Sequence, residues 1–170
     1  MTRRAGILAL TALGALALLA PWLVDLSPIV VWNATASAPI GLYAVVRPRP
    51  LQIGDLVLLR LDADTAALFA ARGYLPEGVP LLKHIRAVAG MLVCAHHGAL
   101  YVAGEHVADT LAVDGAGRTL DAWRGCRTLR ADEILVLNGD APASLDGRYL
   151  GPSPISAVVG RAIPIWTWKR

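Results

Sequence analysis

Lys83 is the residue of this chain that is best suited to act as a base. The chain has 14 arginines but only two lysines, and of these only Lys83 lies in the interior of the sequence. Arginine keeps its charge in any protein environment, whereas a desolvated lysine can lose its proton and act as a general base. The single internal lysine therefore predicts a site that requires a side chain able to lose its proton.

The residues around Lys83 predict an apolar environment for its amine. The run Val79–Ala89 is strand-like, and alternate residues of a strand share one face. Lys83 then shares its face with the apolar side chains of Val79, Leu81, Ile85 and Ala87. Burial disfavours the ammonium form, so we expect a lowered pKa, which suits a base for a serine nucleophile. The alternative is an ordinary lysine whose stem lies on apolar surface while its amine reaches solvent.

Ser37 is the candidate nucleophile, in the run S-A-P-I-G-L-Y. Its small neighbours would let a substrate backbone approach, and Pro39 and Gly41 predict a tight turn. Thr35 could donate its hydroxyl to an oxyanion together with the Ser37 backbone N–H. An ordinary loop serine is the alternative, and the sequon-like Asn33-Ala34-Thr35 is interpreted as chance.

A third group of polar residues follows the run Asn138-Gly139-Asp140 near the C-terminus. Asp146 and Arg148 could form an ion pair here, and Ser144 could orient the lysine amine. The alternative is a solvated turn with a surface ion pair, which contributes little to stability.

A long apolar segment at the N-terminus precedes all of these candidate site residues. Ala5–Val24 is 20 residues without a charge, enough for a helix to cross a hydrocarbon core of roughly 30 Å. Two arginines precede this segment and Asp25 follows it, which predicts a cytoplasmic N-terminus. We therefore predict a cytoplasmic tip and membrane anchor over residues 1–25, and one extracytoplasmic domain over residues 26–170. A cleaved signal peptide is the alternative, but its apolar region is usually shorter.

The rest of the sequence predicts a mainly β, antiparallel domain. Strand-like runs bounded by Gly, Pro or Asp recur along it. Their bounds are Leu42–Arg47, Asp55–Arg60, Val79–Ala89, Met91–Ala95, Ala99–Ala103, Glu133–Leu137 and Val158–Trp166. One short surface helix is predicted over Asp64–Arg72, with Gly73 as its C-cap. A tight hairpin turn is predicted over Ala103-Gly104-Glu105-His106, and a loop or floppy excursion over Asp109–Gly125.

The cysteines and the charge exclude some classes of protein. Cys94 and Cys126 both follow the anchor, and an even pair in an oxidising compartment is predicted to be bridged. His96 and His97 follow Cys94 with a spacing that matches no zinc pattern, so we predict no metal. We also predict no cofactor, since a serine nucleophile with a lysine base needs none. The formal net charge of +3 is too small to indicate a nucleic-acid-binding protein.

Taken together, the three groups of residues resemble those of a known family. They are similar to the type I signal peptidases of the Ser/Lys class, in the conjugative-transfer, pilin-processing (TraF-type) branch. The nucleophile box S-x-P-x-G-L-Y is matched by Ser37, Pro39, Gly41, Leu42 and Tyr43. The lysine box K-R-[IV]-x-A-x-x-G is matched, with His84 in place of the usual Arg, by Lys83, Ile85, Ala87 and Gly90. The C-terminal box S-x-D-S-R-Y-[FW]-G is matched, with mild departures at Gly147 and Leu150, by Ser144, Asp146, Arg148, Tyr149 and Gly151.

This resemblance implies a membrane-anchored serine endopeptidase with a signal-peptidase-like β fold, single-pass in the inner (cytoplasmic) membrane with its catalytic domain on the periplasmic side. Lys83 would take the proton of Ser37 as it attacks the scissile carbonyl. The supporting residues would be Thr35, Ser144, Asp146 and Arg148. The substrate would be an exported precursor such as a conjugative pilin, cleaved after small residues, with hydrolysis and cyclisation both open. The alternatives are a general signal peptidase and a non-catalytic, membrane-anchored pilus assembly protein.

Overall fold

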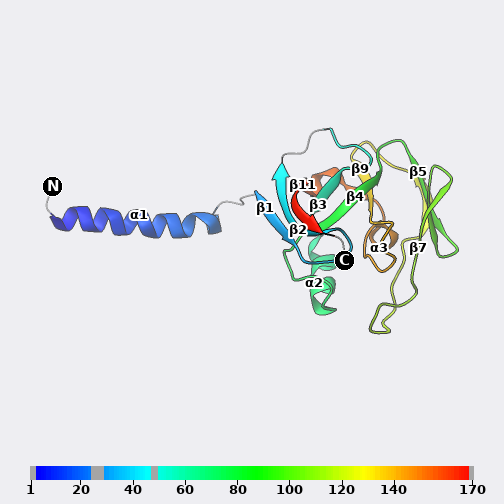
Figure 1. Ribbon diagram of the computed structural model, residues 1–170, viewed down its shortest axis with the longest axis horizontal. Coiled ribbons are helices and arrows are strands. Elements are labelled where there is room, and N and C mark those ends of the chain that lie inside the picture. The colour runs from blue at the N-terminus through cyan, green and yellow to red at the C-terminus, as the bar shows by residue number, and fades with distance from the viewer. Residues whose placement is uncertain (1–2, 24–28, 47–49, 169–170) are drawn as a thin grey trace.

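The computed structural model describes residues 3–23, 29–46 and 50–168. Helix α1 (Arg3–Leu23) lies apart from a mainly β domain in Figure 1. Within the described residues, no helix was found that is long and apolar enough to cross a membrane. The anchor predicted over Ala5–Val24 ends at a residue that lies outside the described part of the chain.

Two antiparallel sheets make up the β domain, which confirms the mainly β, antiparallel prediction (Figure 1). In the described part of the chain, the larger sheet has the strand order β1-β2-β11-β3-β4-β9-β10 and the smaller one the order β7-β6-β5-β8. The strands of the larger sheet are β1 Val30–Asn33, β2 Ile40–Val46, β3 Leu56–Leu59, β4 Leu81–Ala87, β9 Glu133–Leu137, β10 Ser153–Pro154 and β11 Val158–Trp168. Those of the smaller sheet are β5 Leu92–His96, β6 Ala99–Val102, β7 Glu105–Asp109 and β8 Gly125–Thr128.

Strand β4 carries Lys83 and lies inside the larger sheet, between β3 and β9. Its residues alternate between two apolar clusters, because neighbouring residues of a strand point to opposite faces. Leu81 and Ile85 pack in one cluster, whereas Leu82 packs in the other. Lys83 pairs with Val57 of β3, a residue of the first cluster, so it shares the face of Leu81 and Ile85 as predicted.

The predicted apolar face around Lys83 is wrong at its two ends. Val79 precedes β4 and is 43% exposed. Ala87 lies beyond a register shift between β4 and β9 and packs in the cluster under the smaller sheet. The register shift explains the second error, because an extra residue in a strand reverses the alternation beyond it.

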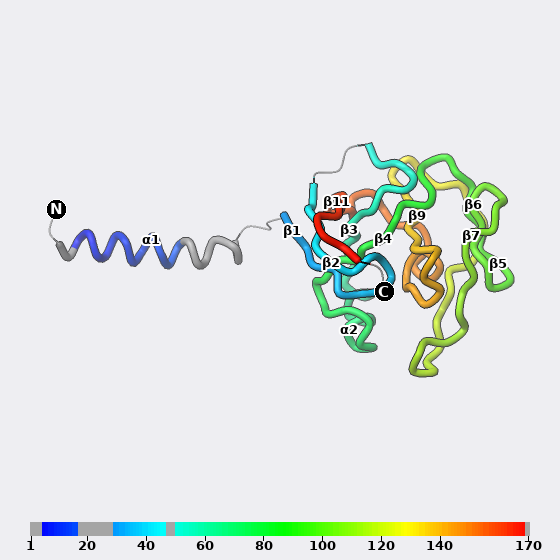
Figure 2. The backbone as a smooth tube through the Cα atoms, viewed as in Figure 1, coloured from blue at the N-terminus to red at the C-terminus, as the bar shows by residue number. Residues whose placement is uncertain are grey.

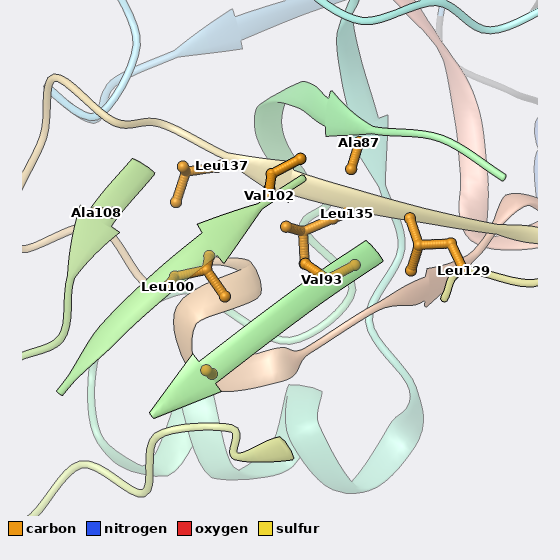
Figure 3. Packing of buried hydrophobic residues seen from close by; sticks show 9 residues of the cluster. Ala87, Val93, Leu100, Val102, Ala108, Leu129, Leu135 and Leu137 are labelled. Atoms are coloured by element: carbon orange, nitrogen blue, oxygen red, sulfur yellow. The ribbon is translucent and has the colours of Figure 1, made fainter. Parts of the chain in front are cut away.

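The inner face of the smaller sheet packs on β9. Figure 3 shows the side chains of this cluster facing one another across the two sheets; those labelled include Val93, Leu100, Val102, Leu135 and Leu137. Next to the cluster, Cys94 and Cys126 are register partners on β5 and β8 and are joined by a disulfide, as predicted.

Helix α2 (Ala63–Ala71) confirms the predicted short helix. The Asp62 side chain caps its N-terminus by accepting a hydrogen bond from the Thr65 N–H. Phe69 is buried and packs in the cluster that also contains Leu81 and Ile85. The predicted hairpin turn is confirmed for Ala103 and Gly104, which have positive φ between β6 and β7, whereas Glu105 and His106 already belong to β7.

The chain between β7 and β8 is a loop, as predicted, but its tip is tied to the end of α2 rather than floppy. Asp114 accepts hydrogen bonds from the Tyr74 hydroxyl and from Arg118 Nε. These bonds, that of Tyr74 first, hold the pKa of the Asp114 carboxyl well below its usual range. Arg118 donates to the Arg72 carbonyl, and Arg72 donates to the Thr119 carbonyl. The loop extends from the smaller sheet towards α2 in Figure 2.

Candidate active site

Ser37 lies in the turn that joins β1 to β2. Asn33 is the last residue of β1 and Ile40 begins β2, so the turn is short and held at both ends by strand pairing. The Tyr43 hydroxyl also donates to the Pro39 carbonyl, which fixes the end of the turn. Ser37 itself is half-buried. The turn therefore presents one serine hydroxyl from a fixed backbone.

Lys83 reaches this turn from β4. Its Nζ atom lies 3.3 Å from Ser37 Oγ and 2.7 Å from Ser144 Oγ. Lys83 as a whole is only 3% exposed, so the amine lies in the interior rather than in solvent. Three of the predicted site residues therefore meet, although they come from the β1–β2 turn, from β4 and from the loop after β9.

Burial lowers the pKa of Lys83 to about 8. The largest cause is desolvation, which disfavours the ammonium form; the charge of Asp146 opposes the shift, and the charge of Arg148 adds to it. A lysine with this pKa is neutral in about a tenth of the molecules at pH 7, against roughly four in ten thousand for a solvated lysine. The site thus supplies an amine that can accept a proton near neutral pH.

Asp146 and Arg148 form a buried ion pair, not the surface pair that the sequence left open. Arg148 Nε and Nη2 each lie 2.9 Å from a carboxylate oxygen of Asp146, and the side chains are 1% and 0% exposed. Other Arg148 donors reach the carbonyls of Ala141 and Pro142 at 2.8 and 3.0 Å. The pair therefore holds together the loop that carries Ser144.

Asn138 joins this loop to β4, a role that the sequence did not reveal. Its side-chain amide donates to the Leu82 carbonyl and accepts from the His84 N–H, both at 3.1 Å. Its backbone N–H donates to Asp146 at 3.1 Å. One side chain therefore holds the backbone on both sides of Lys83. The available signal was the run Asn138-Gly139-Asp140, which precedes the third group of polar residues in the sequence.

Thr35 lies beside Ser37, with 3.4 Å between the two hydroxyl oxygens. It donates its hydroxyl proton to Asn33 Oδ1 at 2.9 Å. Asn33 is buried and is the second functional candidate that the sequence did not reveal, because its run was interpreted as a chance sequon. The role of Thr35 in binding an oxyanion stays a prediction.

Two cavities meet at Ser37. One, of about 620 Å³, is lined mainly by apolar residues and by Lys83 and Ser144. The other, of about 730 Å³, includes the polar side chains of His84, Arg86 and Asp140. Lys83 and the two polar residues that follow it on β4, His84 and Arg86, therefore line different cavities.

The smaller sheet carries the histidines that follow Cys94. The His96 ring stacks on the Tyr101 ring, with 4.7 Å between the ring centroids. Among residues 3–23, 29–46 and 50–168, no three His, Cys, Asp or Glu side chains are grouped so that they could hold a metal ion.

Comparisons with known proteins show which family this chain is similar to. The family model described as signal peptidase, peptidase S26 matches residues 2–168. A probable conjugal transfer protein TraF of Sinorhizobium fredii is 32% identical over 148 residues, covering 80% of this chain and 76% of the relative. A conjugal transfer protein TraF of Agrobacterium tumefaciens is 33% identical over 149 residues, covering 80% of this chain and 81% of the relative. Among solved structures, a signal peptidase I from Enterococcus faecalis is similar with a TM-score of 0.39 and 17% identity, covering 68% of this chain and 98% of that one.

Proposed function

The chain belongs to the signal peptidase family, peptidase S26, and on this premise we propose that it is a serine endopeptidase that processes an exported precursor through a Ser37–Lys83 dyad. One observation carries the proposal: a buried lysine amine, with a pKa of about 8, lies 3.3 Å from a serine hydroxyl. A general base needs hydrogen-bond reach and a pKa near the working pH. The distance between the two atoms is slightly longer than that reach, as is common before a substrate binds.

In the proposed mechanism, neutral Lys83 accepts the Ser37 proton while Ser37 Oγ bonds to the scissile carbonyl carbon. The resulting oxyanion collapses, the peptide bond breaks, and the Lys83 ammonium returns its proton to the leaving amine, which leaves an acyl-enzyme. Ser144 Oγ accepts an N–H bond of the amine at 2.7 Å, so the amine lone pair is free to face Ser37. The Ser37 N–H and the Thr35 hydroxyl would stabilise the oxyanion.

Asp146 and Arg148 have a supporting role in this proposal. Their ion pair holds the loop of Ser144, and Arg148 lowers the pKa of Lys83 while Asp146 raises it. Because the two charges act in opposite directions, the neutral amine depends mainly on burial.

We propose as substrate a conjugative pilin precursor with small residues, such as alanine, at the −1 and −3 positions. The apolar cavity beside Lys83 offers a surface for short side chains next to the reacting carbonyl. The relatives named for conjugal transfer favour a pilin over exported proteins in general. The acyl-enzyme would then be resolved either by water or by the amine of the same substrate, which would give a cyclic product.

We also propose that Ala5–Val24 anchors the chain in the inner membrane, with the catalytic domain on the periplasmic side. The charge-free length of this segment supports an anchor. The Cys94–Cys126 disulfide supports an oxidising compartment for the domain, since disulfides are rare in the cytosol.

The test is to incubate the purified full chain, in detergent, with candidate pilin precursors and with unrelated exported precursors. Intact masses of enzyme and products are recorded over time, with Ser37→Ala as the control. An acyl-enzyme and a product from pilin alone support the proposal, and a cyclic product is lighter than the linear one by one water. Cleavage of every exported precursor would indicate a general signal peptidase instead. Binding without an acyl-enzyme or product would overturn the proposal and indicate an assembly protein.

A further inference from the structure

The Asn33 side chain makes five hydrogen bonds to the turn that carries Ser37. Its Nδ2 donates to the carbonyls of Thr35, Ala38 and Pro39 at 2.9, 3.2 and 3.0 Å. Its Oδ1 accepts from the Thr35 N–H at 3.1 Å and from the Thr35 hydroxyl at 2.9 Å. The side chain is therefore surrounded by the turn that carries the candidate nucleophile.

The orientation of this amide is determined by its partners. Three carbonyl oxygens can only accept, so the NH₂ group must face them; the Thr35 N–H can only donate, so the carbonyl oxygen must face it. The Thr35 hydroxyl must then also donate to Asn33 Oδ1, since a carbonyl oxygen has no proton to give. Towards Ser37 the Thr35 oxygen is left with lone pairs.

A continuous row of polar atoms thus connects Asn33 to the base. It runs from Asn33 Oδ1 to Thr35 Oγ1, then over 3.4 Å to Ser37 Oγ, over 3.3 Å to Lys83 Nζ and over 2.7 Å to Ser144 Oγ. Lys83 and Ser144 are fixed by burial, whereas Thr35 and Ser37 lie on a turn that is partly exposed. Asn33 is the buried residue that binds the partly exposed end of this row, which is formed by Thr35 and Ser37.

We propose that Asn33 is a positioning residue for acylation, an inference that rests on the proposed Ser37–Lys83 function. Its amide closes the turn, so that Ser37 Oγ stays within reach of Lys83. Its carbonyl holds the Thr35 hydroxyl next to Ser37, in the place from which that hydroxyl can turn to a developing oxyanion. Asn33 touches neither the substrate nor the reacting atoms and acts through Thr35 and Ser37.

The test compares Asn33→Ala and Asn33→Asp with the wild-type full chain on a fluorescent peptide with alanine at −1 and −3. Asn33→Asp keeps the shape of the side chain but replaces the NH₂ group, which donates to three carbonyls, by a carboxylate oxygen, which can only accept. We expect kcat per folded molecule to fall roughly 10- to 100-fold in both variants, because small misplacements of reacting groups cost about this much. In Asn33→Ala, KM and the ascending limb of the pH–rate profile should stay near wild-type values, because Asn33 does not touch the substrate and the pKa of Lys83 is lowered mainly by its own burial.

Thr35→Val and the double variant Asn33→Ala/Thr35→Val test whether Asn33 acts through the Thr35 hydroxyl. If it does, the two losses in kcat are not additive, since the groups share one function. Thr35→Ser, which restores the hydroxyl, should recover the rate lost in Thr35→Val. Thr110→Val is the matched control, since Thr110, in the loop after β7, donates its hydroxyl to the Gly98 carbonyl between β5 and β6.

The outcomes separate this inference from the proposed function. A wild-type chain that forms no acyl-enzyme with the peptide overturns both. If the wild type is acylated and folded Asn33 variants match its kcat, only the role of Asn33 is overturned. If neither Asn33 variant folds, the Thr35 series decides: a folded Thr35→Val with wild-type kcat overturns the inference, and a loss that Thr35→Ser recovers supports it.

Discussion

The two faces of β9 pack against two different kinds of interior. Leu135 and Leu137 face the smaller sheet, where the buried cluster is apolar throughout (Figure 3). Ile134 and Val136 face the cluster of β3 and β4, the same side on which Lys83 is buried. One strand therefore separates a purely structural interior from one that also contains the candidate chemistry.

The difference lies in what each interior requires of its residues. Apolar side chains stabilise in proportion to the area they bury and tolerate exchange for others of similar volume. Buried polar groups stabilise nothing unless each finds a partner, and leaving one unpaired is costly. The loop of Ser144 meets this requirement through Arg148, whose donors are divided between Asp146 and the carbonyls of Ala141 and Pro142. The active-site interior is thus more specific and more easily broken.

The largest expected effect is on processing, from substitutions at the dyad. Ser37→Ala and Lys83→Arg should each lower the rate of processing by at least about 10³-fold, because a nucleophile and its base act together and the loss of either removes the catalysis of both. A guanidinium cannot act as a base, so Lys83→Arg should be as inactive as Lys83→Met. Product formation by mass spectrometry measures the rate, and urea unfolding verifies the fold. Substantial turnover by folded Lys83→Arg would exclude Lys83 as the base.

The buried ion pair should show how easily the polar interior is broken. Arg148→Met leaves the Asp146 carboxylate buried without its partner, which typically costs about 3–5 kcal/mol of unfolding free energy. The exposed Arg124 is the matched control, and Arg124→Met should change that free energy by less than about 0.5 kcal/mol. Urea unfolding of both variants makes the comparison. Equal stabilities of the two variants would mean that the pair does not hold the loop.

The disulfide should contribute to the stability of the domain but not to processing, because it lies beside the apolar cluster under the smaller sheet and not in the interior that contains Lys83. Its cysteines are separated by 32 positions, and a closed loop of this length contributes about 3–4 kcal/mol in the chain-entropy estimate. Replacing Cys94 and Cys126 together by serine should lower the unfolding free energy by this amount. Processing by the folded variant at low temperature should match the wild type, and a large loss of kcat there would mean that the smaller sheet takes part in catalysis.

The sequence indicated the fold wherever the side chains of a strand bury apolar area. Strand β9 has the predicted bounds, Glu133–Leu137, because its run Ile134–Leu137 is apolar and lies between two clusters. Strands β7 and β8 were not predicted, because their residues are mostly polar and exposed. They are held by pairing with β6 and β5 and by the disulfide, which are interactions between distant segments.

The same distinction applies to the site. Ser37, Lys83 and Ser144 were predicted because serine and lysine carry their chemistry in the side chain, and their boxes follow in a familiar order. Asn33 and Asn138 were not, because an amide acts here by binding particular backbone groups. Those groups, such as the Leu82 carbonyl for Asn138, are brought to the amide only by the folded chain.

The smallest expected effect, and the sharpest test of the two interiors, is a shift in pH dependence. Because the pKa of Lys83 is lowered to about 8, kcat/KM should be low at pH 6, rise through about pH 8 and level off above it. Leu81→Asp brings a negative charge and water to the face of Lys83, and both favour the ammonium, so the ascending limb should move to higher pH by about one unit.

Leu82→Asp is the matched control, since Leu82 is equally buried on the same strand but packs in the cluster of the opposite face. Leu82→Asp should lower the unfolding free energy about as much as Leu81→Asp does, while it moves the ascending limb of the pH profile less. Rates are taken per folded molecule, so that instability does not enter the profile. Equal shifts in both variants would mean that Lys83 responds to charge near β4 in general, and that its burial on one apolar face does not set its pKa.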